Sequence, residues 1–178
     1  MENKQGFVHL YIGDGKGKTT SAVGLATRAA GWNLNVLYCQ FLKSTISGEL
    51  SALESLNGQV NCFRPTMRHK SFIWNQSKEE INETREDILV GWIHIKELIL
   101  SQHYDVIILD EVLDIVQCGF LLESELVEIV VDNLSSDIVL TGRDASDRLK
   151  DMADYVTSMT AVKHPYQKGI AARKGIEY

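Results

Sequence analysis

The feature that most constrains the fold is a series of short, continuously apolar runs separated by segments with helical periodicity. Strands of a parallel sheet show this pattern, because both faces of the sheet are covered and every side chain meets a packing layer. The sequence therefore predicts an α/β fold, with a mostly parallel sheet and helices on both faces. We predict strands at residues 7–12, 36–41, 60–63, 106–109 and 138–140. In such sheets, ligands bind outside the carboxyl ends of the strands.

Helices are predicted where apolar residues recur every three to four positions. These segments are residues 19–30, residues 48–56, a long helix that begins after residue 77, and a helix around residues 122–131. Ser77 and Glu80 have the spacing of a capping box at the start of the long helix. Its predicted core stripe is Ile81, Ile88, Trp92, Ile95 and Ile99. Residues 64–76 show no periodicity and are predicted to form a mobile loop, while Trp32, like Trp92, is predicted to be a packing residue.

Length and charge limit the possible functions. The 178 residues suffice for a single domain, residues 1–178, with one hydrophobic core. The 18 basic and 24 acidic side chains give a formal net charge of −6, which disfavours a surface that follows a nucleic-acid backbone. No apolar stretch approaches the roughly 18 residues of a membrane span, and no apolar signal segment precedes the first strand. We therefore expect a cytoplasmic protein with neither a membrane nor a nucleic-acid partner.

A glycine-rich loop follows the first predicted strand and leads directly into a helix. Its residues are Gly13, Asp14, Gly15, Lys16, Gly17, Lys18, Thr19 and Thr20. Glycines let the backbone curl so that successive N–H groups point at phosphate oxygens, and the helix N-terminus adds partial positive charge. Lys18 is expected to reach the outer phosphates, and the hydroxyl of Thr19 to bind Mg²⁺. The alternative is a glycine-rich turn without a ligand.

This loop is one residue shorter than the usual phosphate-binding pattern G-x-x-x-x-G-K-[ST]. The pattern requires its first glycine at position 12, where this chain has Ile12, and the glycine is Gly13 instead. A shorter loop is expected to wrap the phosphate chain differently. We therefore predict an unusual pose for the bound nucleotide.

Charged residues end two other predicted strands. Asp110 and Glu111 follow the strand at 106–109, where an acid of a P-loop protein completes the Mg²⁺ shell. Arg143 follows the strand at 138–140 and offers a guanidinium suited to triphosphate oxygens. Acids also end buried strands without binding metal, and a surface arginine is often only solvated, so both alternatives stay open. The residues alone predict a domain that binds Mg²⁺ and ATP, and none of them marks a general base for phosphoryl transfer.

Several motifs, in the same order, resemble the P-loop-type ATP:corrinoid adenosyltransferases, which make adenosylcobalamin. They are the loop 13–20, Gln40-Phe-x-Lys43, Phe72-x-Trp74, Leu109-Asp-Glu111, Thr141-Gly-Arg143 and the tail from Val162-Lys-His164 to Gly175-Ile-Glu-Tyr178. The resemblance covers nearly the whole chain and implies a recombinase-like P-loop fold, usually as a homodimer. It also implies a reaction in which the Co(I) of a corrinoid attacks the 5′ carbon of ATP and triphosphate leaves. The implied partners are ATP, a corrinoid and an electron-donor reductase such as a flavoprotein.

The resemblance also implies roles for individual residues. Lys18, Thr19 and Glu111 take phosphate and metal roles, Arg143 and Mg²⁺ stabilise the departing triphosphate, and Arg28 lies near the nucleotide. Phe72 and Trp74 pack under the corrin ring and displace its lower ligand, which makes Co(II) easier to reduce; the alternative is that both are core aromatics. Family members often have Gly-x-Gly before the first aromatic, where this chain has Arg68-His69-Lys70-Ser71.

Two other functions remain open from the sequence. One is a P-loop ATPase that hydrolyses ATP to ADP, for which Glu111 would orient the water. The other is a corrinoid or nucleotide carrier that binds without turnover, which the altered residues 68–71 keep open. The phosphate product distinguishes the three: triphosphate, ADP with orthophosphate, or none.

Overall fold

The computed structural model describes residues 5–43, 48–56, 58–69, 71 and 73–177. Six strands form one sheet in the order β3-β2-β4-β5-β1-β6, and every pair of neighbours is parallel. The strands are β1 (Val8–Ile12), β2 (Val36–Gln40), β3 (Val60–Phe63), β4 (Val106–Asp110), β5 (Asp137–Thr141) and β6 (Tyr155–Ser158). The predicted parallel α/β fold is confirmed.

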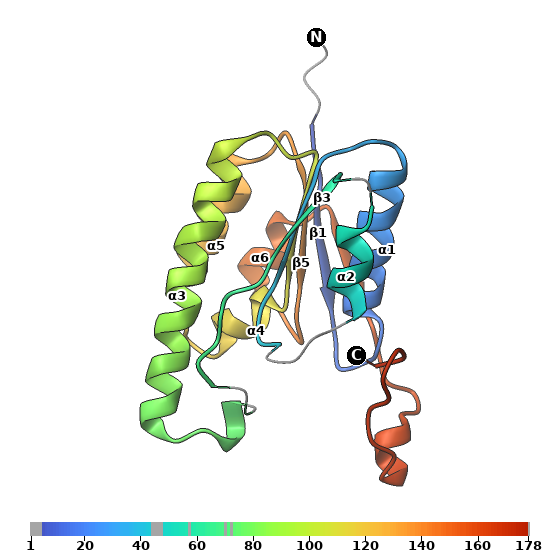
Figure 1. The fold of residues 1–178 in the computed structure, drawn as a ribbon, viewed down its shortest axis with the longest axis vertical. Coiled ribbons are helices and arrows are strands. Elements are labelled where there is room, and N and C mark those ends of the chain that lie inside the picture. Colours follow the sequence, from blue (N-terminus) through green and yellow to red (C-terminus); the bar gives the residue numbers. More distant parts are fainter. Residues whose placement is uncertain (1–4, 44–47, 57, 70, 72, 178) are drawn as a thin grey trace.

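Helices cover both faces of this sheet, as Figure 1 shows. The α-helices are α1 (Lys18–Gly31), α2 (Gly48–Glu54), α3 (Lys78–Ser101), α4 (Val112–Gln117), α5 (Glu123–Asp132) and α6 (Asp147–Met152). Two short 3₁₀ helices span Ile73–Asn75 and Pro165–Lys168. Among the described residues, none of the helices has the length and apolar character needed to cross a membrane.

The core consists of two layers, one on each face of the sheet. Strand side chains alternate between the layers: in β2, Val36 and Tyr38 pack beneath α1 and α2, whereas Leu37 and Cys39 pack beneath α3. The layer under α1 contains four small helix residues, which bring that helix close to the sheet. They are Ala22, Ala26, Ala29 and Ala30. This close packing fixes the start of α1, and with it the glycine-rich loop, at the carboxyl end of β1.

The long helix α3 begins as predicted. Ser77 accepts a hydrogen bond from the N–H of Glu80 (3.2 Å), and the Glu80 carboxylate accepts one from the N–H of Ser77 (2.7 Å), which completes the capping box. Four of the five predicted stripe residues are buried, and Ile81 is half-buried at the edge of the core. The prediction for Trp32 is wrong, because its side chain is 79% exposed beyond the end of α1.

The edge strand β6 was not predicted from the sequence. Its four residues, Tyr155–Ser158, do not form the continuous apolar run by which the other strands are recognised, and all four are exposed. Hydrogen bonding to β1 forms it, with His9 opposite Tyr155 and Ile12 opposite Ser158. The segment beyond it passes directly over the glycine-rich loop and helps to shape the site.

Candidate functional site

The glycine-rich loop lies at the carboxyl end of β1, packed on the backbone that follows β6. The N–H of Gly15 donates to the carbonyl of Met159 (2.7 Å), and the N–H of Met159 donates to the carbonyl of Ile12 (2.8 Å). A Cβ atom at Gly13 or Gly15 would lie 2.3 or 2.6 Å from the Met159 carbonyl oxygen, and Gly13 also has a φ of 112°. Only glycine satisfies this close approach. Met159 has no signal in the sequence, because its strand was not predicted.

Lys18 is the first residue of α1 and its ammonium lies against the loop. Its Nζ donates to the carbonyl oxygens of Gly13 (2.6 Å) and Gly15 (2.9 Å). The preceding residue, Gly17, has a φ of 124°, a conformation that turns the chain into the helix and that side chains disfavour. The loop thus brings an ammonium and a helix N-terminus to one place, which is the arrangement predicted for binding phosphates.

Asp110 is the centre of a hydrogen-bond network at the carboxyl end of β4. Its carboxylate is fully buried and accepts hydrogen bonds from Thr19 Oγ1 (3.0 Å) and Thr141 Oγ1 (2.7 Å). From β2 it accepts hydrogen bonds from Gln40 Nε2 (3.0 Å) and the Tyr38 hydroxyl (3.3 Å). Burial, followed by the charge of Asp110, raises the pKa of Tyr38, so this phenol remains a hydrogen-bond donor. The predicted meeting of Thr19 and Asp110 is therefore seen, whereas Tyr38 was not predicted from the sequence.

Glu111 follows directly but lies in a different backbone conformation. Its φ and ψ of 64° and 16° are left-handed, it precedes the first residue of α4, and its N–H donates to Thr141 Oγ1 (2.8 Å). Burial and then the neighbouring charge of Asp110 raise the pKa of Glu111 to about 7, although Lys43 and Lys18 act in the opposite direction. Glu111 thus titrates near neutral pH beside the loop.

Arg143 joins the end of β5 to the glycine-rich loop through its backbone. Its carbonyl accepts from the N–H of Gly13 (2.8 Å), and its N–H donates to Asp114 Oδ1 (3.0 Å). Burial raises the pKa of Asp114, against the opposing hydrogen bond and charge of Arg143. Gly142 lies so close to α4 that a Cβ atom there would be 2.5 Å from Leu113 Cβ. The Arg143 backbone is therefore held beside the loop by contacts on both sides, and its side chain is exposed.

The oxygen atoms gathered here fit a magnesium ion. Asp110 is a buried carboxylate whose four side-chain partners are all neutral, and the Thr19 hydroxyl lies against it. Mg²⁺ prefers oxygen ligands and is usually held by one or two carboxylates together with substrate phosphates. Within the described part of the chain, no group of three or more His, Cys, Asp or Glu side chains could hold a metal alone. Thr19 and Asp110, with Glu111 adjacent, would thus hold the ion together with the nucleotide.

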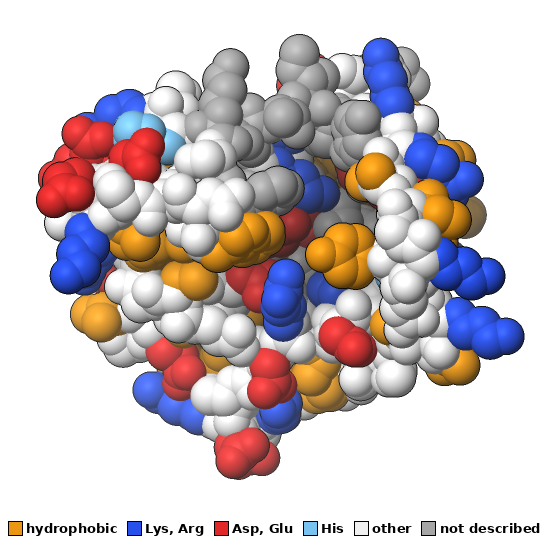
Figure 2. All heavy atoms as spheres, turned by 90° about the horizontal axis from the view of Figure 1, so that it is seen from below, with side chains coloured by type: hydrophobic (Ala, Val, Ile, Leu, Met, Phe, Trp, Pro, Cys, Tyr) orange, Lys and Arg blue, Asp and Glu red, His pale blue; other side chains and the backbone are white. Residues whose placement is uncertain are grey.

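The other predicted residues of the loop lie on its outer side. Lys16 donates to the carbonyl of Ile176 in the C-terminal tail (2.7 Å), and the Asp14 carboxylate accepts from the N–H of Ala161 (3.4 Å). Thr20 is exposed in the first turn of α1. Figure 2 shows this end of the molecule, where basic and acidic side chains surround a central hollow.

Arg28 and Trp74 lie outside the cluster. Arg28 is exposed in the last turn of α1, about 15 Å along the helix axis from Lys18 at 1.5 Å per residue, so the structure does not bring it to the loop. Trp74 lies in the 3₁₀ helix before α3 and is 71% exposed, which excludes the alternative that it is a core aromatic. Phe72 lies outside the described residues. The 3₁₀ helix Ile73–Asn75 lies at the same end of the molecule as the start of α1 (Figure 1).

Comparison with known proteins gives the family. A model of the family described as "ATP:corrinoid adenosyltransferase BtuR/CobO/CobP" matches residues 4–178. The chain belongs to this family. Curated relatives include the corrinoid adenosyltransferase of Escherichia coli K12, which is 29% identical over 99% of this chain and 88% of the relative. The corrinoid adenosyltransferase CobA of Salmonella typhimurium is 30% identical over the same shares, and that of Pseudomonas aeruginosa is 29% identical over 99% of this chain and 85% of its own.

Family membership confirms the resemblance and the class of enzyme, an alkyl-group transferase of the P-loop type. The family uses ATP and a corrinoid as substrates, and its members are named for that transfer. The roles of Lys18, Arg143, Trp74 and the other site residues stay predictions that rest on the geometry described above.

Proposed function

We propose that this chain transfers the 5′-deoxyadenosyl group of ATP to the Co(I) of a corrinoid and releases inorganic triphosphate, as a step in adenosylcobalamin synthesis or salvage. The observation that carries the proposal is the meeting of three strand ends: the glycine-rich loop, the buried Asp110 hydrogen-bonded to Thr19, and Arg143 bonded through its carbonyl to Gly13. Membership of the corrinoid adenosyltransferase family supplies the reaction class.

The reaction is a displacement at carbon. The electron pair of Co(I) forms the bond to C5′, and the C5′–O bond breaks with its electrons on the triphosphate. Negative charge therefore builds on the leaving group. The N-terminus of α1 and the Lys18 ammonium lie at this loop, where they would stabilise that charge. Arg143 is joined to the loop by its backbone, and its exposed guanidinium would contact the triphosphate. Mg²⁺ held by Thr19 and Asp110 would supply further neutralisation of the triphosphate.

No proton has to move in this displacement, so the reaction needs no general base. Asp110 accepts hydrogen bonds from four side chains and so holds Thr19 in place. Trp74, exposed in the 3₁₀ helix Ile73–Asn75, is proposed to lie under the corrin ring together with Phe72 and displace the lower ligand of cobalt. Removing that ligand would ease the reduction of Co(II), with electrons from a reductase such as a flavoprotein.

We further propose that the chain forms a homodimer. Apolar residues of the C-terminal tail support this, because Val162, Tyr166 and Ile170 are all exposed on a segment that extends from the body of the domain (Figure 1). Light scattering after size-exclusion chromatography measures the mass directly. A monomer at micromolar concentration would contradict the proposal.

One observation favours a second candidate, ATP hydrolysis. Glu111 has a pKa of about 7 and lies beside Asp110 and Lys18, where a carboxylate near neutrality could orient a water molecule. Hydrolysis would yield ADP and orthophosphate, whereas adenosyl transfer yields triphosphate. The two reactions are thus distinguished by their products.

The test is an anaerobic assay with purified protein, Mg-ATP and chemically reduced Co(I) corrinoid. We expect a light-sensitive alkylcobalt spectrum and one triphosphate per turnover, both lost in Lys18→Ala. ADP and orthophosphate with an unchanged corrin spectrum would replace the proposal with the ATPase. A spectral shift on binding without any product would indicate a carrier. Trp74→Ala and Phe72→Ala should slow the reaction that starts from Co(II) more than the one that starts from Co(I).

A further inference from the structure

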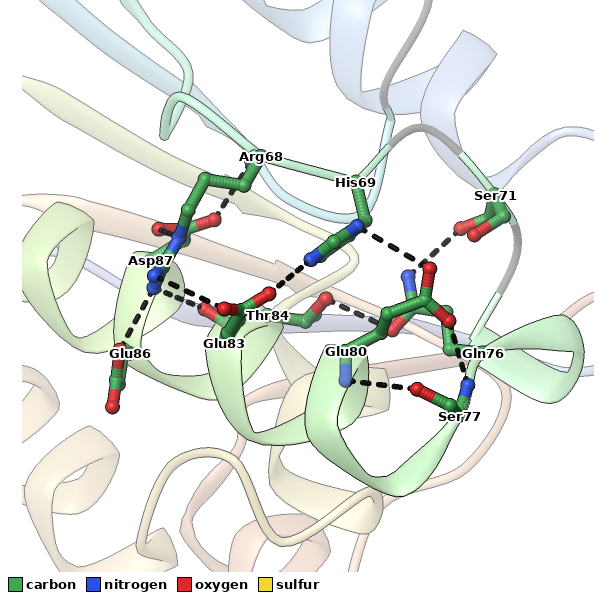
Figure 3. Close-up of polar contacts among 10 residues, drawn as sticks. All are labelled: Arg68, His69, Ser71, Gln76, Ser77, Glu80, Glu83, Thr84, Glu86 and Asp87. Carbon is green, nitrogen blue, oxygen red and sulfur yellow. Dashed lines mark hydrogen bonds and ion pairs between the residues drawn. The ribbon is translucent and has the colours of Figure 1, made fainter.

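The segment between β3 and α3 is fastened to α3 by Arg68, as Figure 3 shows. The Asp87 carboxylate accepts both the backbone N–H and the Nε–H of Arg68, each at 2.8 Å. The Nη2 atom of the guanidinium donates to Glu86 Oε2 (2.9 Å) and to the backbone carbonyl of Glu83 (2.8 Å). A single arginine therefore makes four hydrogen bonds to two consecutive turns of one helix, with the planar fork that lysine lacks.

His69 adds a second attachment one turn nearer to the start of α3. Its Nε2 is hydrogen-bonded to Glu83, and its Nδ1 lies 3.5 Å from Glu80 Oε1, so the ring lies between two carboxylates (Figure 3). Glu80 also closes the capping box with Ser77. The attachment of the segment and the start of the helix thus share one side chain.

Further contacts hold the same segment on either side of Arg68 and His69. Before them, Pro65 is buried against α3, where a Cβ at Gly91 would meet its ring at 2.6 Å. After them, the Gln76 side chain donates to the carbonyl of Ser71 (3.0 Å) and accepts from the buried Thr84 hydroxyl (2.9 Å). The backbone that carries Trp74 is therefore attached to α3 both upstream and downstream.

Trp74 itself presents a large apolar surface to solvent on this attached backbone, with 71% of the residue exposed. An exposed aromatic on a backbone that is already attached is suited to contact a flat apolar ligand, because attachment reduces the conformational freedom that binding would remove. We propose that Arg68 and His69 are positioning residues: by fastening their segment to α3 they fix Trp74 where the corrin ring binds. This inference rests on the proposed function.

The first measurement tests the attachment alone and requires no corrinoid. Arg68→Ala and Asp87→Asn each weaken the hydrogen bonds that join Arg68 to Asp87. Both variants should therefore increase hydrogen–deuterium exchange at the amide of residue 68 and across residues 73–77. The double variant should exchange no faster than either single one, because both act on one contact. The matched control is Arg85→Ala, which removes the same charge from an exposed position of α3 at which no polar contact is seen among the described residues.

The second measurement tests the role in the reaction. In the adenosyl-transfer assay, Arg68→Ala should raise the KM for corrinoid about three- to tenfold, the range expected for losing an exposed charged network, with the KM for ATP unchanged. Arg68→Lys keeps the charge without the fork and should restore only part of the affinity. Arg85→Ala should match the wild type in both constants.

The outcomes separate the two proposals. Exchange in Arg68→Ala equal to wild type would refute the attachment, whatever the activity. Faster exchange with an unchanged corrinoid KM in an active enzyme would refute the positioning role and leave the proposed function intact. A wild-type protein that makes no alkylcobalt would refute the proposed function, and the positioning role with it, while the exchange data would still decide whether the segment is attached.

Discussion

Replacing Gly91 by alanine should destabilise the protein, although alanine is the better helix former. Gly91 is buried within α3, and a Cβ atom there would lie 2.6 Å from both Cβ and Cγ of Pro65. Carbon atoms pack at about 3.5–4.0 Å, so the two groups must separate by about 1 Å. The Pro65 ring is rigid, and its backbone has to move with it.

The magnitude follows from two opposing effects. Overpacking a close contact costs about 1–3 kcal/mol, while alanine gains about 1 kcal/mol over glycine in helix propensity. The expected net loss is therefore on the order of 1 kcal/mol. Gly24→Ala is the matched control, since Gly24 is exposed in α1 and a Cβ atom there would meet nothing within 4 Å. That change should increase the free energy of unfolding by about 0.5–1 kcal/mol.

Urea unfolding followed by circular dichroism measures both variants. The denaturation midpoint should fall for Gly91→Ala and rise for Gly24→Ala, with unchanged slopes. Pro65→Gly removes the opposing ring, so in a double-mutant cycle it should recover the loss at Gly91. If both alanine variants were stabilised alike, or if the cycle showed no coupling, the close contact between α3 and Pro65 would be refuted.

Three further predictions follow from the buried groups. Asp110→Asn should lower the free energy of unfolding by about 2–4 kcal/mol, because an amide NH₂ replaces one acceptor oxygen and the loss of one or two of the four hydrogen bonds to this charged group costs about 1.5–3 kcal/mol each. It should also abolish Mg-ATP binding measured by calorimetry. Without Mg²⁺ and ATP, the free energy of unfolding should fall by on the order of 2 kcal/mol as pH rises from 4.5 to 7. The reason is that the folded protein holds the Glu111 proton more tightly than the unfolded chain does. In urea titrations at several pH values, Glu111→Gln should remove this dependence on pH. A thiol reagent at pH 8 should label the exposed Cys118 first and Cys62 slowly, because burial raises the pKa of Cys62 to about 11; it should reach the buried Cys39 only on unfolding. Equal labelling rates for all three cysteines, measured by mass spectrometry, would contradict this.

Local signals were sufficient to predict most of the fold. The capping box of α3 depends on two residues three positions apart, so Ser77 and Glu80 could be recognised without any knowledge of the tertiary structure. Five strands contain mostly apolar residues and were predicted to within one residue at each end. β6 was not predicted, because its residues are exposed and only its hydrogen bonds to β1 make it a strand.

The loop, Thr19 and the charged residues of the site were predicted, but the hydrogen bonds of Tyr38 and Thr141 to Asp110 were not. The loop and Asp110 follow strands directly, so their meeting at one edge of the sheet could be inferred. The role of Tyr38 and Thr141 as donors to Asp110 depends on β4 lying between β2 and β5, and sequence periodicity does not give strand order. Arg68 was noted only as part of the altered residues 68–71, because its partner Asp87 lies 19 residues away on another element.

Glu111 shows how the fold separates two adjacent acids into different roles. Side chains of successive strand residues point to opposite faces, so a continuing strand could not direct both Asp110 and Glu111 into one site. The left-handed conformation of Glu111 ends β4 and starts α4 instead, and it leaves the Glu111 carboxyl near Asp110 and Lys18. This conformation costs a non-glycine residue about 1–2 kcal/mol, and burial of the carboxyl beside another acid opposes its ionisation. Both effects destabilise the folded chain, and such costs concentrate where a residue binds or reacts. The conformation of Glu111, and the raised pKa that follows from the place it gives the carboxyl, therefore support together its placement in the functional site.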